Sequence, residues 1–127
     1  MVPIRLAVMD GDCPLICSVW FLFSPEESLF RCVSHGESQL IKLLRINPRV
    51  GFEIALNEPP YKGVRGKGVV RLTQDGVADR LNSVILRFLG DTASGLAKWL
   101  LGRSEQEYVI EISPDWITSW DYSERMT

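Results

Sequence analysis

Residues 38–54, SQLIKLLRINPRVGFEI, pass from a helical pattern to a strand pattern within one short segment. Apolar residues first recur at helical spacing, at Leu40, Ile41 and Leu44. Ser38 precedes them as a candidate N-cap. Ser34 with Glu37 has the spacing of a capping box and offers an alternative, earlier start. The segment therefore predicts a short amphipathic helix.

A proline marks the end of this helix. Pro48 follows it, and the residue before a proline is driven toward an extended backbone, which we expect at Asn47. Apolar residues then alternate, so that one face of a strand carries Val50, Phe52, Ile54 and Leu56. This junction predicts a helix that leads directly into a half-buried strand.

Further strands are predicted on both sides of this junction. Period-two patterns and turn signals place them at residues 3–10, 15–23, 29–34, 49–56, 64–72 and 107–114. Amphipathic helices are expected over residues 75–90 and 94–102. Tight turns join the first three strands, so their pairing is antiparallel. Six strands in so short a chain favour a small closed or nearly closed barrel with helices over its ends.

Two strands have unusual faces. Residues 15–23, LICSVWFLF, are apolar on both faces, which predicts cover on both sides. Gly66 and Gly68 share one face of the strand at 64–72, where glycine costs stability. Such glycines mark a bend, or the close approach of another backbone or of a ligand.

Length and composition indicate one soluble domain over residues 1–127. The chain is 46% hydrophobic and 24% charged, with a net charge of −2, which gives no electrostatic basis for binding nucleic acid or an anionic membrane. No apolar stretch is long enough to span a bilayer. Three widely spaced cysteines without a signal peptide favour a reducing cytoplasm, and no metal site is expected.

The last residues, WITSWDYSERMT, carry large aromatic side chains at Trp116, Trp120 and Tyr122. Chain ends usually fray unless something holds them. These aromatics therefore either close the protein's own core or cover a partner or a ligand.

Three stretches, in this order and spacing, resemble one known family. PLICSVWFLF resembles the second strand of that family. SQLIKLLRINPRVGFEI resembles its helix and the strand that follows, and YKGVRGKGVVRL resembles a later strand that contains glycine. ITSWDYSERM is similar to the tails of one branch. The family is that of the pyridoxamine-phosphate-oxidase-like FMN-binding split barrels, and the branch is that of the flavin- and deazaflavin-dependent reductases.

The resemblance implies a mainly β protein with short helices: a six-stranded antiparallel Greek-key split β-barrel that forms a homodimer. It further implies FMN, or alternatively a deazaflavin, at two sites along the dimer interface. The positions that match the ring site are Val19, Trp20, Phe21, Val33 and Ser34. Trp120 is expected to cover the ring or to pack against the other subunit.

The phosphate end departs from the family pattern. The position of the lysine or arginine that holds the phosphate is occupied by Leu40. Ser38 and Gln39 remain as neutral donors at the helix N-terminus. The substitutes for the missing cation are Lys42, or else Tyr61 and Lys62 on the proline-rich loop. Lys42 is equally well explained as a solvated surface lysine. His35 is a loop histidine that either stays solvated or meets the phosphate.

The sequence shows no nucleophile with a plausible base, no pair of carboxylates that it would place together and no phosphate-binding loop, so no catalytic side chain is assigned. Any hard chemistry must come from a bound cofactor. The resemblance then implies an oxidoreductase that transfers hydride to or from a small organic substrate. The alternative is a non-catalytic relative that binds another planar ligand or none.

Overall fold

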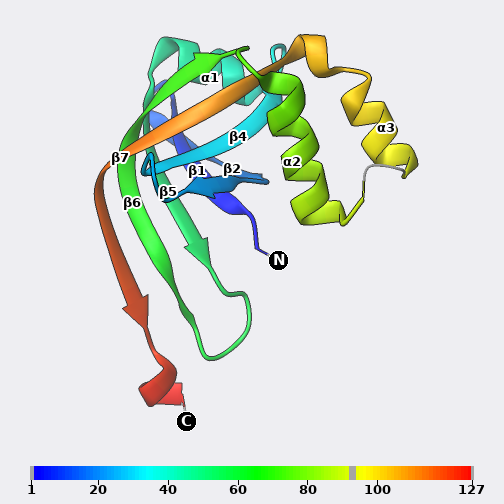
Figure 1. Ribbon diagram of the computed structural model, residues 1–127. Helices are drawn as coiled ribbons and strands as arrows, with labels where there is room; N and C mark the ends of the chain where they lie inside the picture. The colour runs from blue at the N-terminus through cyan, green and yellow to red at the C-terminus, as the bar shows by residue number, and fades with distance from the viewer. Residues whose placement is uncertain (1, 92–93, 127) are drawn as a thin grey trace.

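The computed structural model describes residues 2–91 and 94–126 and has one antiparallel sheet with helices at one side (Figure 1). The strands follow the order β2-β1-β5-β6-β7-β4-β3 across the sheet. Their bounds are β1 Ile4–Asp10, β2 Cys13–Val19, β3 Leu22–Ser24, β4 Leu29–His35, β5 Arg49–Ala55, β6 Lys62–Thr73 and β7 Glu107–Asp121. The helices are α1 Gln39–Ile46, α2 Val77–Leu89, α3 Gly95–Leu101, η1 Ser104–Gln106 and η2 Ser123–Met126. The predicted mainly β, antiparallel architecture is confirmed.

The junction that begins at Ser38 forms as predicted. The Ser38 hydroxyl caps α1 by accepting a hydrogen bond from the backbone N–H of Ile41. Asn47 has an extended backbone, with φ −138° and ψ 108°, as expected before a proline. The earlier start at Ser34 is wrong, because Ser34 still belongs to β4 and pairs with Tyr108.

The second predicted strand is divided in two. Trp20 and Phe21 belong to neither ladder, and they separate β2 from β3. β2 and β3 lie at opposite ends of the strand order, so the chain crosses from one edge of the sheet to the other at these two residues. The described residues therefore form seven strands where the sequence predicted six.

The aromatic tail is strand, and the prediction that the last strand ends at residue 114 is wrong. β7 continues to Asp121 and pairs with β6 down to Lys62. A bulge lies in this pairing, where Lys67 faces Trp116 and Gly68 faces Pro114. The aromatic side chains do not close the core: Trp116 is 50% exposed and Tyr122 is exposed as well.

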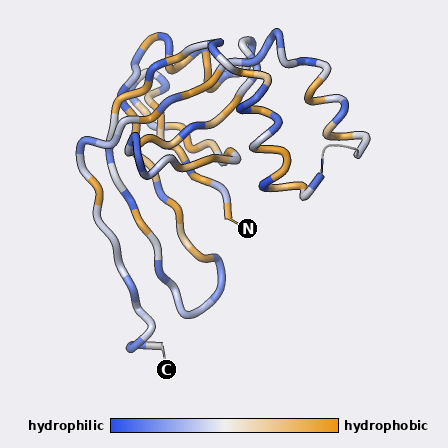
Figure 2. Tube along the Cα trace, in the orientation of Figure 1, coloured by the Kyte–Doolittle hydropathy of each residue, from blue (hydrophilic) through white to orange (hydrophobic). Residues whose placement is uncertain are grey.

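Two hydrophobic clusters hold the layers together. The larger cluster fills the barrel, with side chains from the strands and the buried face of α1. The smaller one lies under α2 and α3 and contains Leu81, Ile85 and Ala97. Figure 2 shows that apolar segments gather where strands and helices meet, while the second half of β7 is mostly pale or blue. That half of β7 therefore gains little from this chain's own core.

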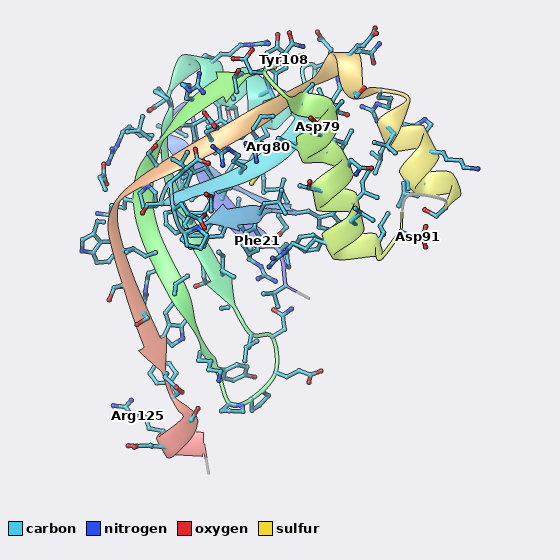
Figure 3. The ribbon with its side chains drawn as sticks, viewed as in Figure 1. Phe21, Asp79, Arg80, Asp91, Tyr108 and Arg125 are labelled. Atoms are coloured by element: carbon cyan, nitrogen blue, oxygen red, sulfur yellow. The ribbon has the colours of Figure 1, made fainter. Side chains whose placement is uncertain are left out.

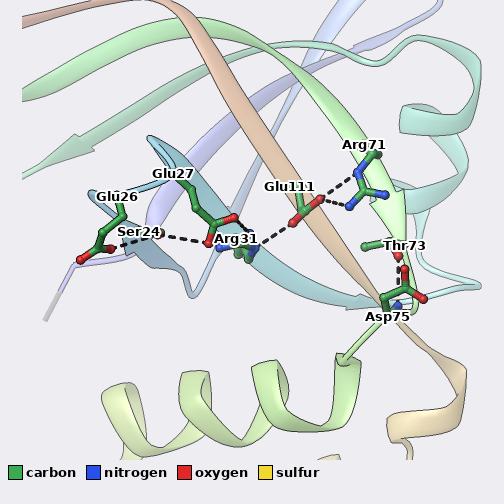
Figure 4. Close-up of polar contacts among 8 residues, drawn as sticks. All are labelled: Ser24, Glu26, Glu27, Arg31, Arg71, Thr73, Asp75 and Glu111. Carbon is green, nitrogen blue, oxygen red and sulfur yellow. Dashed lines mark hydrogen bonds and ion pairs between the residues drawn. The ribbon is translucent and has the colours of Figure 1, made fainter.

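A charged cluster ties three strands together on the same sheet face. Arg31 on β4 and Arg71 on β6 both lie opposite Glu111 on β7. The two arginine Nε atoms donate to the Glu111 carboxylate at 2.8 and 2.9 Å, and Arg31 also contacts Glu27 (Figure 4). Burial alone would raise the pKa of Glu111, but the bonds from Arg31 and Arg71 outweigh it and hold that pKa below its usual range.

The close approach of β6 and β7 predicts a strict need for glycine at position 68. A Cβ at Gly68 would lie 2.5 Å from the Ser113 carbonyl oxygen. Gly68→Ala should lower the free energy of unfolding by about 1–3 kcal/mol, because the strand backbones must separate. Urea unfolding followed by circular dichroism measures this. Gly95→Ala, where a Cβ meets nothing within 4 Å, is the control and should be neutral or stabilising.

The Glu111 cluster predicts a pH-dependent contribution to stability. Glu111→Gln should lower the free energy of unfolding at pH 7 by about 3 kcal/mol, since the buried Arg31 loses its buried carboxylate and keeps only the more exposed Glu27. In the wild type, a lowered folded-state pKa means that this stabilisation is complete above the ordinary glutamate pKa. It is lost as the pH falls through the folded-state value. Urea unfolding at several acidic pH values should therefore show a shallower acid loss in Glu111→Gln. The exposed Glu58→Gln serves as control, and an equal loss in both variants would contradict the argument.

Candidate functional site

The helices α2 and α3 enclose a pocket against the barrel, which we name the helix-covered pocket. Its volume is about 470 Å³. The residues that line it are Pro3, Ser18, Val19, Trp20, Val33, Leu81, Val84, Leu96, Leu100 and Glu107. Three of the predicted ring-site residues, Val19, Trp20 and Val33, thus lie around one largely apolar pocket.

The break in the second strand forms one wall of this pocket. The Trp20 ring stacks on Phe88 of α2, with ring centroids 5.4 Å apart and an interplanar angle of 11°. Phe21, also a predicted ring residue, is buried in the core, and its ring centroid lies 6.1 Å from those of Phe30 and Phe88. Because Trp20 and Phe21 belong to no ladder, strand pairing does not use their backbone N–H and C=O groups. A flat slot with backbone groups beside it suits the ring and the hydrogen-bonding edge of a heterocycle.

A glutamate that the sequence did not single out also lines the pocket. Glu107, the first residue of β7, is 4% exposed. Burial raises the pKa of its carboxyl, and the opposing effects of Arg103 and His35 do not cancel this. No sequence motif marks Glu107, and the helix residues that line the pocket read as ordinary apolar faces. The only signal in the sequence was a carboxylate two residues before Val109, on the same face of the strand.

The predicted phosphate residues surround the start of α1 but do not form a cationic site. The Ser38 hydroxyl is used as the helix cap, and its oxygen lies 2.9 Å from that of Ser34. Gln39 is exposed. Lys42 is exposed too, and its Nζ lies 3.8 Å from the Glu37 carboxylate, which agrees with a solvated surface lysine.

Leu40 faces the other way. Its side chain is 5% exposed and packs in the main core, because its spacing with Ile41 and Leu44 puts it on the buried face of α1. The expectation that Leu40 contacts a cofactor is therefore a misassignment: a side chain at this position is directed into the barrel.

The remaining predicted residues lie at the opposite end of the molecule. Tyr61, Lys62 and Trp120 sit where β6 begins and β7 ends, and Lys62 and Trp120 line a separate shallow pocket there. From Glu107 to Trp120 the chain follows roughly 40 Å of strand. Figure 3 shows this separation, with Asp79 on α2 and Arg125 after β7 at opposite ends. Within one chain these residues do not share a site with Trp20.

A second apolar groove crosses the outer face of the sheet, and we name it the sheet groove. Ladder pairing places Ile16, Ala7, Gly51, Lys67 and Trp116 in one row across five strands. All five line a groove of about 370 Å³. Cys17 and Val19 pack against the core, but Ile16 is 69% exposed, so the predicted cover is missing from the outer face of β2 among the described residues.

The helix-covered pocket fits a flavin-like ring but not a phosphate. Its walls are apolar, and Glu107 is the one charged group among its described lining residues. A phosphate dianion needs cationic or N–H donors, and a nearby carboxylate opposes it. The described residues contain no cluster of three histidine, cysteine or acidic side chains arranged for a metal ion. No helix among them is long and apolar enough to cross a membrane.

Solved structures with the same fold identify its type. A conserved hypothetical protein from Mycobacterium tuberculosis has a TM-score of 0.79 at 19% identity, over 98% of this chain and 80% of that chain. An F420 reductase has a TM-score of 0.75 at 18% identity, over 92% of this chain and 89% of that chain. A Listeria innocua protein assigned provisionally as a pyridoxamine 5'-phosphate oxidase has a TM-score of 0.69 at 18% identity, over 97% of this chain and 90% of that chain.

These matches confirm the split-barrel fold that the sequence resemblance implied. Identities below 20% establish the fold alone, since one fold hosts several chemistries. No family model matches the chain, and no curated protein matches its sequence. The chemistry must therefore be argued from the pocket itself.

Proposed function

We propose that the protein is an oxidoreductase that binds a flavin or deazaflavin ring in the helix-covered pocket. The observation that carries this proposal is the convergence of Val19, Trp20 and Val33, chosen from sequence, on one apolar pocket. The F420 reductase and oxidase-like folds among the structural relatives support the same cofactor class. FMN is the first candidate, and a deazaflavin is the alternative.

In this proposal the chain supplies position and an apolar environment. A bound ring would accept or donate hydride. The walls from α2 and α3 would pack against the ring, and the backbone around Trp20 would orient the ring edge. A small organic substrate would approach over the open face of the ring. Among the described pocket residues, Glu107 is the only one with an ionisable side chain.

The proposal includes a homodimer, because the predicted site is divided within one chain. Within one chain, Tyr61, Lys62 and Trp120 lie far from the helix-covered pocket. In a homodimer, the same three residues of the partner subunit would lie beside it. The sheet groove supports this, since Ile16 and Trp116 expose apolar surface on both sides of a small-residue floor. A cofactor phosphate at the pocket mouth would then meet Lys62 of the partner subunit.

The second candidate is a non-catalytic barrel that binds another planar ligand. The absence of any lysine or arginine among the described residues that line the helix-covered pocket favours it. Affinity separates the two candidates: the oxidoreductase must bind a phosphorylated flavin or deazaflavin, whereas the non-catalytic barrel need not.

The proposed location is the cytoplasm. Cys13, Cys17 and Cys32 are all free thiols, which suits a reducing compartment. Burial raises the pKa of Cys32, so this thiol is protonated and unreactive.

Blocking the pocket should abolish cofactor binding. Ser18 lines the pocket from the exposed strand β2, so Ser18→Trp fills the entrance without removing a core side chain. We expect the wild type to bind FMN or a deazaflavin at micromolar level, seen as quenched cofactor fluorescence. Ser18→Trp should weaken this binding at least about tenfold, the effect of 1.4 kcal/mol.

Ser83→Trp is the matched control, because Ser83 is exposed on α2 outside the pocket lining. It should bind like the wild type. Wild-type protein that is colourless and shows neither quenching nor a thermal shift with either cofactor would refute the oxidoreductase.

A charge in the sheet groove should separate the subunits. Ile16→Glu replaces the most exposed apolar side chain of β2 by a carboxylate, so a partner would have to bury a charge in place of apolar surface. We expect a dimer for the wild type and a monomer of unchanged circular dichroism for the variant, measured by light scattering after size exclusion. Ile46→Glu, on the exposed face of α1, is the control and should stay dimeric. A monomeric wild type would exclude the shared site.

A further inference from the structure

The sheet groove combines an apolar floor with a basic rim, and the helix-covered pocket has no such rim among its described lining residues. We propose that this groove binds an elongated apolar carboxylate, for which a medium-chain fatty acid is the simplest model. The alkyl chain would lie along the floor, and the carboxylate would meet the cations of the rim. The inference concerns a second ligand and needs one subunit only. In the proposed homodimer this ligand would lie at the seam between the subunits.

The shape of the groove suits an elongated body. Ala7 and Gly51 form its floor, which stays low because one side chain is a methyl group and the other a hydrogen. Ile16, 69% exposed, lies at one end of the row, and Trp116, 50% exposed, lies at the other. β1 and β5 separate Ile16 on β2 from Lys67 on β6, so the floor is about 14 Å across, which is three strand spacings. The groove volume of about 370 Å³ is typical of small-ligand sites.

The rim of the groove is basic although the whole chain is acidic. Three lining residues are cations, Arg5, Arg65 and Lys67, and Glu53 is the one acidic residue of the described lining. Three positive charges and one negative charge give the lining a net charge of +2, whereas the whole chain carries −2. Such a local excess attracts an anion and repels a cation.

Carboxylates of the chain do not neutralise this rim. Arg5, Arg65 and Lys67 take part in none of the ion pairs between described residues. Arg5 donates instead to the Asn57 side-chain oxygen at 3.1 Å. Glu53 lies between Arg5 and Arg65 in the ladder but forms an ion pair with neither. The positive charge of the rim can therefore act on a ligand.

Aromatic rings hold two of these cations beside the groove. The Arg65 guanidinium carbon lies 4.7 Å from the centroid of the Trp120 ring, and the Lys67 Nζ lies 5.8 Å from that of Trp116. Stacking of this kind uses the face of a guanidinium and does not occupy its in-plane N–H donors. A carboxylate at the rim can then accept charge-assisted hydrogen bonds from both cations.

Other arginines of the sheet show the contrast. Arg31 and Arg71 both contact Glu111, and Arg49 contacts Asp115, so their counter-charges belong to the chain. The groove cations lie instead beside exposed apolar surface. An apolar carboxylate removes that surface from water and brings the missing negative charge. A cation of the same shape would be repelled by the rim.

Calorimetric titration with three probes tests the proposal. The probes are decanoate below its micelle concentration, decylamine as the cation of equal chain length, and acetate as the head group alone. Each is titrated into the wild type, Lys67→Gln, Gly51→Val and Lys98→Gln. Lys98→Gln is the matched control, because Lys98 is exposed on α3 and does not line the groove.

Gly51→Val is designed to fill the floor without harming the fold. A Cβ at Gly51 would lie 3.7 Å from the Ala7 Cβ, an ordinary contact distance, and the φ of Gly51 is not positive. Valine also suits a strand. The variant should therefore fold like the wild type, which circular dichroism and thermal unfolding verify before any titration is compared.

We expect the wild type to bind decanoate at least about tenfold more tightly than decylamine, because the rim favours one charge over the other. Acetate should show no binding at the same concentrations, since it lacks an apolar body. Lys67→Gln should weaken decanoate binding about three- to fivefold, the effect of one partly exposed ion pair. Gly51→Val should lose decanoate binding, and Lys98→Gln should bind like the wild type.

Equal decanoate affinity in Gly51→Val and the wild type would overturn the proposal, because the ligand would then lie elsewhere. Decylamine binding as tight as that of decanoate would overturn it too. So would binding to vesicles of anionic phospholipid without binding of free decanoate, since the groove would then face a membrane surface.

FMN titration and light scattering on the same samples keep this inference separate from the proposed function. Decanoate binding without flavin binding would refute only the oxidoreductase, and decanoate binding by a monomer would refute only the homodimer. Flavin binding by a dimer that takes no decanoate would refute only the ligand of the groove.

Discussion

The crossing of the chain at Trp20 and Phe21 is the constraint on which the remaining structure depends. These two residues carry one continuous segment from the β2 edge of the sheet to the β3 edge. The crossing puts Phe21 into the core and Trp20 against Phe88 of α2. It also leaves β2 with only one strand neighbour, and therefore exposed. The barrel, the helix-covered pocket and the open apolar edge all follow from this one interruption.

Local signals in the sequence predicted the elements well, because they act through the backbone of near neighbours. Ser38 caps α1, Pro48 sets the extended Asn47, and Gly90 ends α2 with a positive φ. The glycine at position 68 was ambiguous between a ligand and a second backbone, and the second backbone is present. Pairing over long distances was less predictable. The exposed end of β7 has no burial pattern of its own, and only its ladder with β6 makes it strand.

The sequence predicted part of the candidate site. Val19, Trp20 and Val33 were assigned to a ring site from the family resemblance, and the fold brings these three residues to one pocket. That they bind a ring stays a prediction. Leu40 was misassigned because a family position does not reveal which way a side chain points once a lysine is replaced by leucine. Glu107 was missed because its burial comes from the packing of distant segments around the start of β7, which no local pattern in the sequence reveals.

The two buried glutamates of β7 show how one strand face serves two purposes. Glu111 is held by Arg31 and Arg71, so its charge is compensated and it fixes the register of three strands. Glu107 lies four residues earlier on the same face, past the end of β6, and its cation is Arg103, whose Nε lies 3.9 Å from the carboxylate. The arginines that hold Glu111 come from neighbouring strands, whereas Arg103 comes from the turn just before η1 in the same segment of chain. The Glu111 ion pairs therefore fix the pairing of strands, while the Glu107 pair fixes only the start of β7 and leaves this carboxylate lining the helix-covered pocket.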